Sequence, residues 1–277
     1  MSQIMIETEN LHYQYPDGTP ALAGISLQIE QGKKFAVLGS NGAGKSTLFL
    51  HWNGILRPAK GSVYYKGNMV KYNHKALLQL RQKVGIVFQD PDTQLFSASV
   101  YQEVSFGALN LGLPEDVVKE RVERALEATE IMHLLDRPTQ FLSYGQKKMV
   151  AIADILAMEP EVIILDEPTA YLDPLYTKKT MALLDRLQQQ GVTIILSTHD
   201  VNMAYAWADE ILVMKAGKLI TQGRPEYIFS DHLLLEDTNL TKPLILEMYE
   251  ELHRVGHLDP SLTKPRNKQE LFGLLRK

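Results

Sequence analysis

Hydrophobic residues gather in short runs along the chain, and longer amphipathic stretches separate these runs. Four runs are rich in valine and isoleucine and are apolar on both faces: Phe35–Leu38, Val84–Phe88, Val162–Leu165 and Thr193–Leu196. Strands of this kind are typical of a parallel sheet that helices cover on either side. The pattern therefore predicts four buried strands.

Two of the stretches between these runs have helical periodicity. Glu115–Thr129 is rich in charge and places Val118, Val122, Ala125 and Leu126 at helical spacing. Pro174–Gln190 is a second amphipathic stretch, and Gly191 ends it. Because strands and helices alternate, we expect an α/β fold.

The N-terminal part has a different pattern, in which apolar and polar residues alternate around turn residues. Ile4–Tyr15, Ala23–Ile29 and Gly61–Val70 read in this way, with a turn at Pro16-Asp17-Gly18. We therefore expect antiparallel strands and hairpins there.

Beyond about Gly223 the strand signals stop. The rest of the chain reads as helices that Pro243, Pro260 and Pro265 interrupt. We expect a main domain over residues 1–225 and a C-terminal helical extension over residues 226–277.

Composition excludes several classes of protein. The 277 residues have a formal net charge of −4, so no overall positive field favours nucleic acid, and no nucleic-acid partner is expected. The absence of cysteine excludes disulfides, thiolate metal sites and cysteine nucleophiles. The eight histidines are scattered without metal-ligand spacing. No signal peptide and no run of about 20 apolar residues is found, so we expect a membrane role only through a partner.

A glycine-rich motif follows the first buried strand and precedes a helical run, Thr47–Asn53. It fits the phosphate-binding pattern G-x-x-x-x-G-K-S/T, and its candidate nucleotide-binding residues are Gly39, Ser40, Asn41, Gly42, Ala43, Gly44, Lys45, Ser46 and the next residue, Thr47. Backbone N–H groups and the helix N-terminus favour phosphate. Lys45 is expected on the β- and γ-phosphates of ATP, and Ser46 on Mg²⁺.

A pair of carboxylates, Asp166 and Glu167, follows the strand Val162–Leu165 directly. The carboxyl ends of parallel strands are where α/β sheets bind ligands, and carboxylates buried there without a cation would be costly. We expect Asp166 to hold Mg²⁺ and Glu167 to act as the general base toward the attacking water.

The segment Leu142-Ser143-Tyr144-Gly145-Gln146 resembles the signature sequence of ABC ATPases, usually Leu-Ser-Gly-Gly-Gln. The other motifs of that family stand around it in family order. Tyr15 resembles the aromatic residue that stacks on adenine, Gln89 the Q-loop glutamine and His199 the switch histidine, and residues 171–173 resemble the D-loop. Tyr13 is a second candidate for adenine, and we choose Tyr15 because it precedes Pro16.

The resemblance implies a P-loop ATPase core with a mixed sheet and a helical signature subdomain at about residues 90–160. It also implies a head-to-tail pair of ATPase subunits with two ATP molecules between them. Ser143, Gly145 and Gln146 would then bind the γ-phosphate held by the opposite subunit. Gln89 would contact Mg²⁺ or the water, and His199 would donate to the γ-phosphate. Lys45, Gln89, Glu167 and His199 are thus the candidate catalytic residues.

Two residues depart from the family pattern. Tyr144 replaces the first glycine of the signature pair, and its backbone N–H stays available. Met149 stands where arginine is frequent, which removes a charge near the signature helix. We expect this to weaken an electrostatic link to the Gln89 region, without loss of activity.

The segment Gln89–Phe96 resembles the Q-loop extension of energy-coupling-factor transporter ATPases, which serve importers of vitamins, cobalt or nickel. The signature followed by Lys147 and Lys148 is similar to the cobalt-type members. The resemblance implies a peripheral subunit on the cytoplasmic face of the cell membrane. Its expected partners are a second ATPase, held in part by the C-terminal extension, an integral membrane coupling subunit that docks near Gln89–Phe96, and a membrane subunit that binds the solute.

Four interpretations are considered at this point. The transporter imports cobalt or nickel, which we favour, or it is a vitamin transporter with two different ATPases. A soluble ABC ATPase acting on ribosomes or DNA is a different class, but such proteins usually carry two ABC domains, coiled coils or basic insertions. A nucleotide sensor without hydrolysis is disfavoured because Asp166, Glu167 and His199 are all present.

Overall fold

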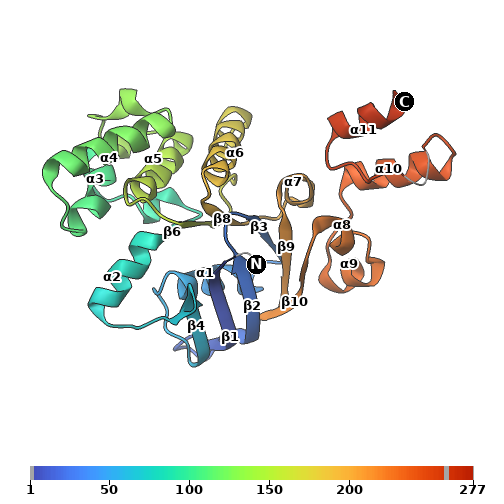
Figure 1. Ribbon diagram of the computed structural model, residues 1–277, viewed down its shortest axis with the longest axis horizontal. Coiled ribbons are helices and arrows are strands. Elements are labelled where there is room, and N and C mark those ends of the chain that lie inside the picture. The colour runs from blue at the N-terminus through green and yellow to red at the C-terminus, as the bar shows by residue number, and fades with distance from the viewer. Residues whose placement is uncertain (1–2, 259–261, 277) are drawn as a thin grey trace.

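A mixed sheet forms the centre of the molecule (Figure 1). The computed structural model describes residues 3–258 and 262–276, and in these residues the central sheet has six strands in the order β10-β9-β3-β8-β7-β6. Five of them run parallel, and β10 pairs antiparallel with β9. The strands are β3 (Lys34–Leu38), β6 (Val84–Val87), β7 (Val162–Leu165), β8 (Thr193–Ser197), β9 (Glu210–Lys215) and β10 (Lys218–Gly223).

This sheet confirms the expected α/β class and the four buried strands, with ends that differ by at most one residue from the prediction. The strands β9 and β10 were not predicted. Residues 211–214 of β9 are as apolar and as buried as the predicted runs, so the same signal was present there.

Both faces of the central sheet are covered, which explains why its strands are apolar throughout. Within β3, Phe35 and Val37 pack in one hydrophobic cluster, while Ala36 and Leu38 pack in the other. Successive side chains of a strand point to opposite faces. A strand with a core on each side therefore needs an apolar residue at every position.

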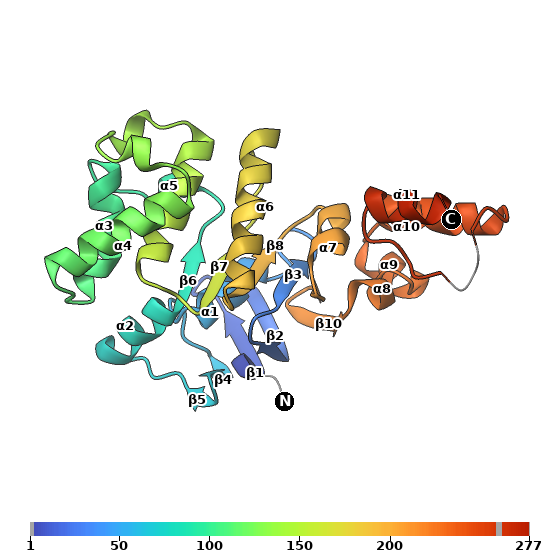
Figure 2. The same cartoon turned by 45° about the horizontal axis from the view of Figure 1, so that its top comes forward.

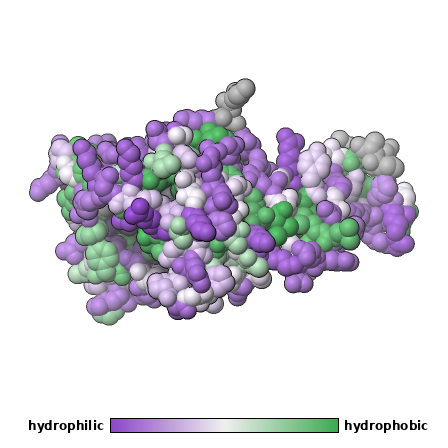
Figure 3. Space-filling model, turned by 90° about the horizontal axis from the view of Figure 1, so that it is seen from below, coloured by the Kyte–Doolittle hydropathy of each residue, from purple (hydrophilic) through white to green (hydrophobic). Residues whose placement is uncertain are grey.

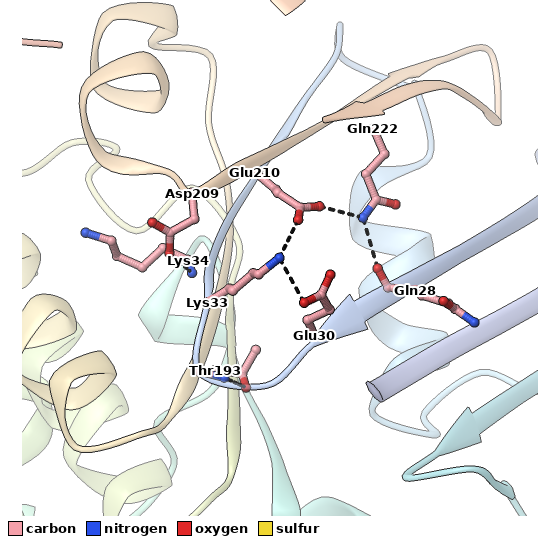
Figure 4. Close-up of polar contacts among 9 residues, drawn as sticks. Gln28, Glu30, Lys33, Lys34, Thr193, Asp209, Glu210 and Gln222 are labelled. Atoms are coloured by element: carbon pink, nitrogen blue, oxygen red, sulfur yellow. Dashed lines mark hydrogen bonds and ion pairs between the residues drawn. The ribbon is translucent and has the colours of Figure 1, made fainter. Parts of the chain in front are cut away.

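A second sheet is antiparallel, as the alternating N-terminal pattern predicted. Its order is β2-β1-β4-β5, with β1 at Ile4–Gln14, β2 at Pro20–Glu30, β4 at Lys60–Tyr65 and β5 at Asn68–Met69. A network of polar side chains joins it to the central sheet (Figure 4). Lys33 Nζ lies 2.9 Å from Glu30 and 2.7 Å from Glu210, and Gln222 donates to Glu210 and to the carbonyl of Gln28.

Helices lie around these sheets. Three of them, α3 (Val100–Asn110), α4 (Glu115–Ala128) and α5 (Tyr144–Ala157), stand together on one side of the molecule (Figure 1). Next to them, α6 (Pro174–Gln189) rises from the sheet between α5 and α7 (Val201–Trp207) (Figure 2). The remaining helices of the main part are α1 (Lys45–Trp52) and α2 (His74–Lys83).

The C-terminal residues form four helices within the described chain, on the side opposite α3–α5 (Figures 1 and 2). They are α8 (Pro225–Ile228), α9 (His232–Thr238), α10 (Leu244–Arg254) and α11 (Lys268–Leu275). Pro243 caps α10 and Pro265 lies before α11, whereas Pro260 and Lys277 fall outside the described residues. Figure 3 shows hydrophobic surface on this part of the molecule, and its exposed apolar residues include Leu233, Leu244, Met248 and Phe272.

Candidate functional site

The glycine-rich loop lies between β3 and α1, and its conformation requires glycine at two positions. Gly39 has φ 153° and Gly44 has φ 99°, a region that L side chains rarely adopt. A Cβ on Gly39 would lie 2.3 Å from the carbonyl oxygen of Met214, and one on Gly44 would lie 2.6 Å from that of Ala21. The loop therefore approaches the neighbouring backbone too closely for any side chain.

A cavity of about 410 Å³ opens above this loop. It collects residues that follow four strands of the central sheet: the loop after β3, Gln89 after β6, Asp166 and Glu167 after β7, and His199 after β8. The carboxyl ends of parallel strands meet at one edge, which is the usual ligand position in such sheets. The other lining residues are Tyr15, Thr19, Pro20, Ala21, Asn41, Gly42, Ala43, Gly44, Lys45, Ser46 and Thr47.

Lys45 is held over the loop that precedes it. Its Nζ donates to the carbonyl oxygen of Gly39 at 2.7 Å and to that of Ser40 at 3.3 Å. Burial lowers the pKa of Lys45, and the carboxylates of Glu167 and Asp166 oppose that shift. A partly desolvated cation in the first position of α1 is suited to binding an anion.

Two hydroxyl groups hold the carboxylate of Asp166. Ser46 donates to its Oδ2 and Ser197, at the end of β8, donates to its Oδ1, each at 2.5 Å. The backbone N–H of Glu167 donates to Ser197 Oγ at 2.9 Å. Serine hydroxyl and aspartate carboxylate oxygens are hard ligands of the kind that Mg²⁺ prefers, so Ser46 and Asp166 fit this ion. Ser197 was not among the predicted site residues.

Glu167 is held in an uncommon backbone conformation, with φ 46°. Its side chain is largely buried, and burial raises its pKa, although His199 and Lys45 act in the opposite direction. Nε2 of His199 lies 3.0 Å from Glu167 Oε1. This oxygen accepts no hydrogen bond of regular geometry from the described residues. A buried carboxylate with a raised pKa suits a general base.

The two candidate tyrosines for adenine lie in different places. Tyr15 lines the cavity, and its hydroxyl lies 3.0 Å from the hydroxyl of Thr47. Tyr13 packs edge-on against the buried His51, with 4.8 Å between ring centroids. The position on the cavity wall therefore belongs to Tyr15.

The signature segment forms the start of α5, which begins at Tyr144 and so earlier than the expected position near Gln146. The reason is a capping box. Ser143 Oγ accepts from the N–H of Gln146, and the Gln146 side chain accepts from the N–H of Ser143. Gly145 is packed under Tyr176, since a Cβ there would lie 2.6 Å from the ring. In the described chain, none of these residues lines the 410 Å³ cavity.

The start of α5 is bound to the loop that contains Gln89. The carbonyl oxygen of Gln89 accepts from Tyr144 at 2.9 Å and from Lys148 at 2.6 Å, and Lys147 pairs with Asp92 at 2.6 Å. Burial lowers the pKa of Lys148 to about 8. Met149 takes no part in this link, because its side chain is buried against Thr180, and the expected weakening of the link stays a prediction.

The residues after Gln89 form a short helical turn, η1 (Pro91–Thr93). Beyond it lies a second cavity of about 410 Å³, whose wall includes Asp92, Leu95, Phe96 and Lys147. Phe96 is 66% exposed and packs edge-on against Phe106. An exposed aromatic pair beside a cavity is a surface suited to a partner with apolar side chains.

Two kinds of feature are missing from the described residues. No helix among them is long and apolar enough to cross a membrane. Nor do they contain a group of three or more histidine or acidic side chains that could hold a metal ion.

Comparisons with known proteins agree with the motifs. A family model described as ABC transporter matches residues 22–170. The energy-coupling factor transporter ATP-binding protein EcfA3 of Clostridium perfringens is 49% identical over 259 residues, which are 93% of this chain and 87% of that protein.

Solved structures agree as well. The structure of cbiO1 from Clostridium perfringens, part of the ABC transporter complex cbiONQ, matches with a TM-score of 0.76 and 48% identity, over 91% of this chain and 99% of that one. An ATP-binding cassette solved as a dimer in a post-hydrolysis state, bound to ADP and Pi, matches with a TM-score of 0.73 and 27% identity, over 80% of this chain and 99% of that one.

Proposed function

Because the chain belongs to the ABC transporter ATPases and is the ATP-hydrolysing subunit of an energy-coupling-factor transporter, we propose that this transporter imports cobalt or nickel ions. The observation that carries the choice of solute is the signature itself. Tyr144 in place of glycine, followed by Lys147 and Lys148, resembles the cobalt-type members of the family. The ion itself would bind a membrane subunit.

We propose that ATP occupies the cavity above the glycine-rich loop. The backbone N–H groups of residues 39–47 and the ammonium of Lys45 bind its phosphates, and Tyr15 stacks on the adenine. Ser46, Asp166 and Gln89 hold Mg²⁺, which neutralises phosphate charge when bound. The hydroxyl and carboxylate oxygens of Ser46 and Asp166, already in contact with each other, support this ligand set.

We propose that Glu167 takes the proton of the attacking water and that His199 donates to the γ-phosphate. Burial supports the first role because it raises the proton affinity of the Glu167 carboxylate. The 3.0 Å contact between His199 and Glu167 places both side chains at the same end of the cavity. Gln89 joins them from the end of β6 and orients the water.

A second ATPase subunit would complete each site. Ser143, Gly145 and Gln146 lie away from the cavity of their own chain, so the γ-phosphate that they bind would be the one in a partner's cavity. The N-terminus of α5 favours an anion there. Two copies of this chain would form two competent sites, because every catalytic motif is present.

We propose that the membrane coupling subunit docks near Gln89–Phe96, in the groove bordered by the exposed Phe96. A separate membrane subunit then binds the solute, and the ATPase is a peripheral protein on the cytoplasmic face. Residues 226–277 help to hold the two ATPases together through the exposed apolar residues of α9 to α11.

Purification from native membranes in mild detergent tests this proposal. A single ATPase species, a transmembrane coupling subunit and a metal-binding membrane subunit are expected, together with ATP-dependent uptake of cobalt or nickel into vesicles that carry the complex. The Glu167→Gln complex is the matched control and should show no uptake. A second, distinct ATPase together with a vitamin-binding subunit would overturn the metal assignment, and the absence of any membrane partner would overturn the import function.

A further inference from the structure

We infer that Tyr144 and Lys148 are positioning residues for ATP hydrolysis, because their side chains fasten the carbonyl group of Gln89 to the start of α5. The inference rests on the role proposed above for Gln89. It assigns a function to Tyr144, which replaces the usual glycine of the signature. It also assigns one to Lys148, which does not line the nucleotide cavity.

Both side chains donate to one backbone oxygen. Tyr144 Oη lies 2.9 Å from the carbonyl oxygen of Gln89, and Lys148 Nζ lies 2.6 Å from it. The two residues are four positions apart on α5, so they share one face of the helix. Lys148 Nζ also donates to the carbonyl oxygen of Phe88 at 2.9 Å, so two successive peptide groups are held.

The burial of Lys148 indicates that its contacts are specific. Its side chain is fully buried, and it is among the largest fully buried side chains of the described chain. An ammonium group taken out of water is costly unless it finds acceptors. Here it finds two carbonyl oxygens and lies 5.9 Å from the ring centroid of Tyr144. An apolar side chain would fill this space without that cost, but it would leave both carbonyl groups without these donors.

These contacts set the direction of the Gln89 side chain. The peptide group after Gln89 is fixed by α5, and the N–H of Phe88 donates to the side chain of Gln94 at 3.1 Å. The loop is thus held on both sides of Gln89, and Gln89 lines the cavity together with Glu167 and His199. A shift of α5 must move Gln89, and loss of the two donors must release it.

The test compares ATP hydrolysis by full-length Tyr144→Phe, Lys148→Gln and Gln89→Ala with that of the parent chain. Tyr144→Phe removes a single oxygen atom. We expect kcat to fall about fivefold, the effect of one ordinary hydrogen bond, while KM for ATP stays within about twofold. In a Gln89→Ala background, Tyr144→Phe should cause no further loss, because it acts through the Gln89 side chain.

Tyr64→Phe is the matched control, since it removes a tyrosine hydroxyl that donates to Glu9 at 2.9 Å on the antiparallel sheet, and its kcat should equal that of the parent. If Gln89→Ala leaves kcat unchanged, the proposed role of Gln89 fails. If Gln89→Ala lowers kcat but Tyr144→Phe does not, the positioning role alone fails. Additive losses in the double variant also contradict it. The melting temperature of Lys148→Gln shows whether a loss of its activity reflects unfolding. If it does, the inference is judged on Tyr144→Phe.

Discussion

The two neighbouring acidic residues of the cavity, Asp166 and Glu167, have different hydrogen-bond partners. Asp166 accepts hydrogen bonds from the hydroxyl groups of Ser46 and Ser197, whereas Glu167 Oε1 accepts no regular hydrogen bond from the described residues. Burial raises the pKa of the Glu167 carboxyl group, so it binds a proton more readily than an exposed carboxylate does. These different surroundings fit the two proposed roles, Mg²⁺ binding for Asp166 and proton transfer for Glu167.

The role of Glu167 is tested by Glu167→Gln. Glutamine keeps the shape of the side chain but cannot accept the proton, so kcat for ATP hydrolysis should fall by about 10²- to 10⁴-fold. ATP binding should persist, and the variant should accumulate as a closed, ATP-loaded dimer. Phosphate release and size-exclusion chromatography with ATP measure the two effects. Rapid turnover by this variant would contradict the assignment.

Asp154 on α5 predicts a pH dependence of stability. Burial and the nearby Glu103 carboxylate raise its pKa from 3.8 to about 7, although a hydrogen bond from Gln94 acts to lower it. Between these two pH values the native chain keeps a proton that the unfolded chain has lost. The free energy of unfolding therefore falls as pH rises through this window.

In Asp154→Asn the side chain stays neutral at every pH. The variant should melt at a higher temperature than the parent above pH 7, and the difference should vanish as pH falls toward 3.8. Calorimetry across this range measures it. Asp136→Asn, at an exposed position, is the control and should follow the parent. A constant difference at all pH values would exclude titration of Asp154 as its cause.

The glycine-rich loop can be tested as an element, because two glycines with similar backbone angles have different surroundings. Gly44 has φ 99° and Gly191 has φ 93°. Alanine at either position would be strained by about 1–2 kcal/mol, because an L side chain is disfavoured in the left-handed backbone conformation. At Gly44 its Cβ also meets the carbonyl of Ala21 at 2.6 Å, whereas at Gly191 nothing lies within 4 Å.

Gly44→Ala should therefore destabilise the chain by roughly 1–3 kcal/mol more than Gly191→Ala. Urea unfolding measures the difference. Gly44→Ala should also lose affinity for ATP, while Gly191→Ala keeps it. Equal effects of the two substitutions would mean that the loop shifts to admit a side chain.

The elements that build the cavity could be predicted from the sequence because their local patterns are strong. Each buried strand supplies residues to two hydrophobic clusters, so the pattern is unbroken, and the phosphate loop needs glycine at fixed positions. The strand β9 has the same pattern at residues 211–214 and was not predicted. Its position beside β3 depends on pairing between distant segments.

Contacts between elements could not be predicted in this way. Ser197 reaches Asp166 because β8 lies beside β7, with Leu196 opposite Leu165. Lys148 reaches Gln89 because α5 lies against the end of β6. The order of strands in the sheet is not encoded in any single run. From the sequence, Lys148 is only a charged residue that follows the signature segment. Its complete burial follows from the packing of α5 and is seen only in the structure.

At the scale of the whole molecule, Arg266 joins the C-terminal helices to the main part. Its guanidinium donates to Glu226 at 2.6 Å and to the carbonyl of Ala208 at 2.7 Å, and it lies 5.8 Å from the ring centroid of Tyr205. Hydrogen bonds from a charged donor contribute roughly 1.5–3 kcal/mol each. This single side chain is therefore a main attachment of α11.

Arg266→Met should loosen that attachment. Amide hydrogen exchange in α11 should become at least about tenfold faster, because the loss of one such bond changes the local opening equilibrium by that much. Exchange in the central strands should not change. Arg254→Met is the control, since Arg254 is exposed and pairs with Glu251 on its own helix. Unchanged exchange in α11 would show that other contacts hold it.

The strand order has a consequence for how the chain is made. β3, which carries the phosphate loop, pairs with β8 and β9, more than 150 residues later in the chain. During synthesis the N-terminal hairpin of β1 and β2 can pair early, but β3 has no neighbour in its sheet until residues 193–215 have left the ribosome. Long-range pairing of this kind slows folding. The nucleotide site can therefore assemble only after residues 193–215 have been synthesised, and a nascent chain gains the ability to bind ATP only then.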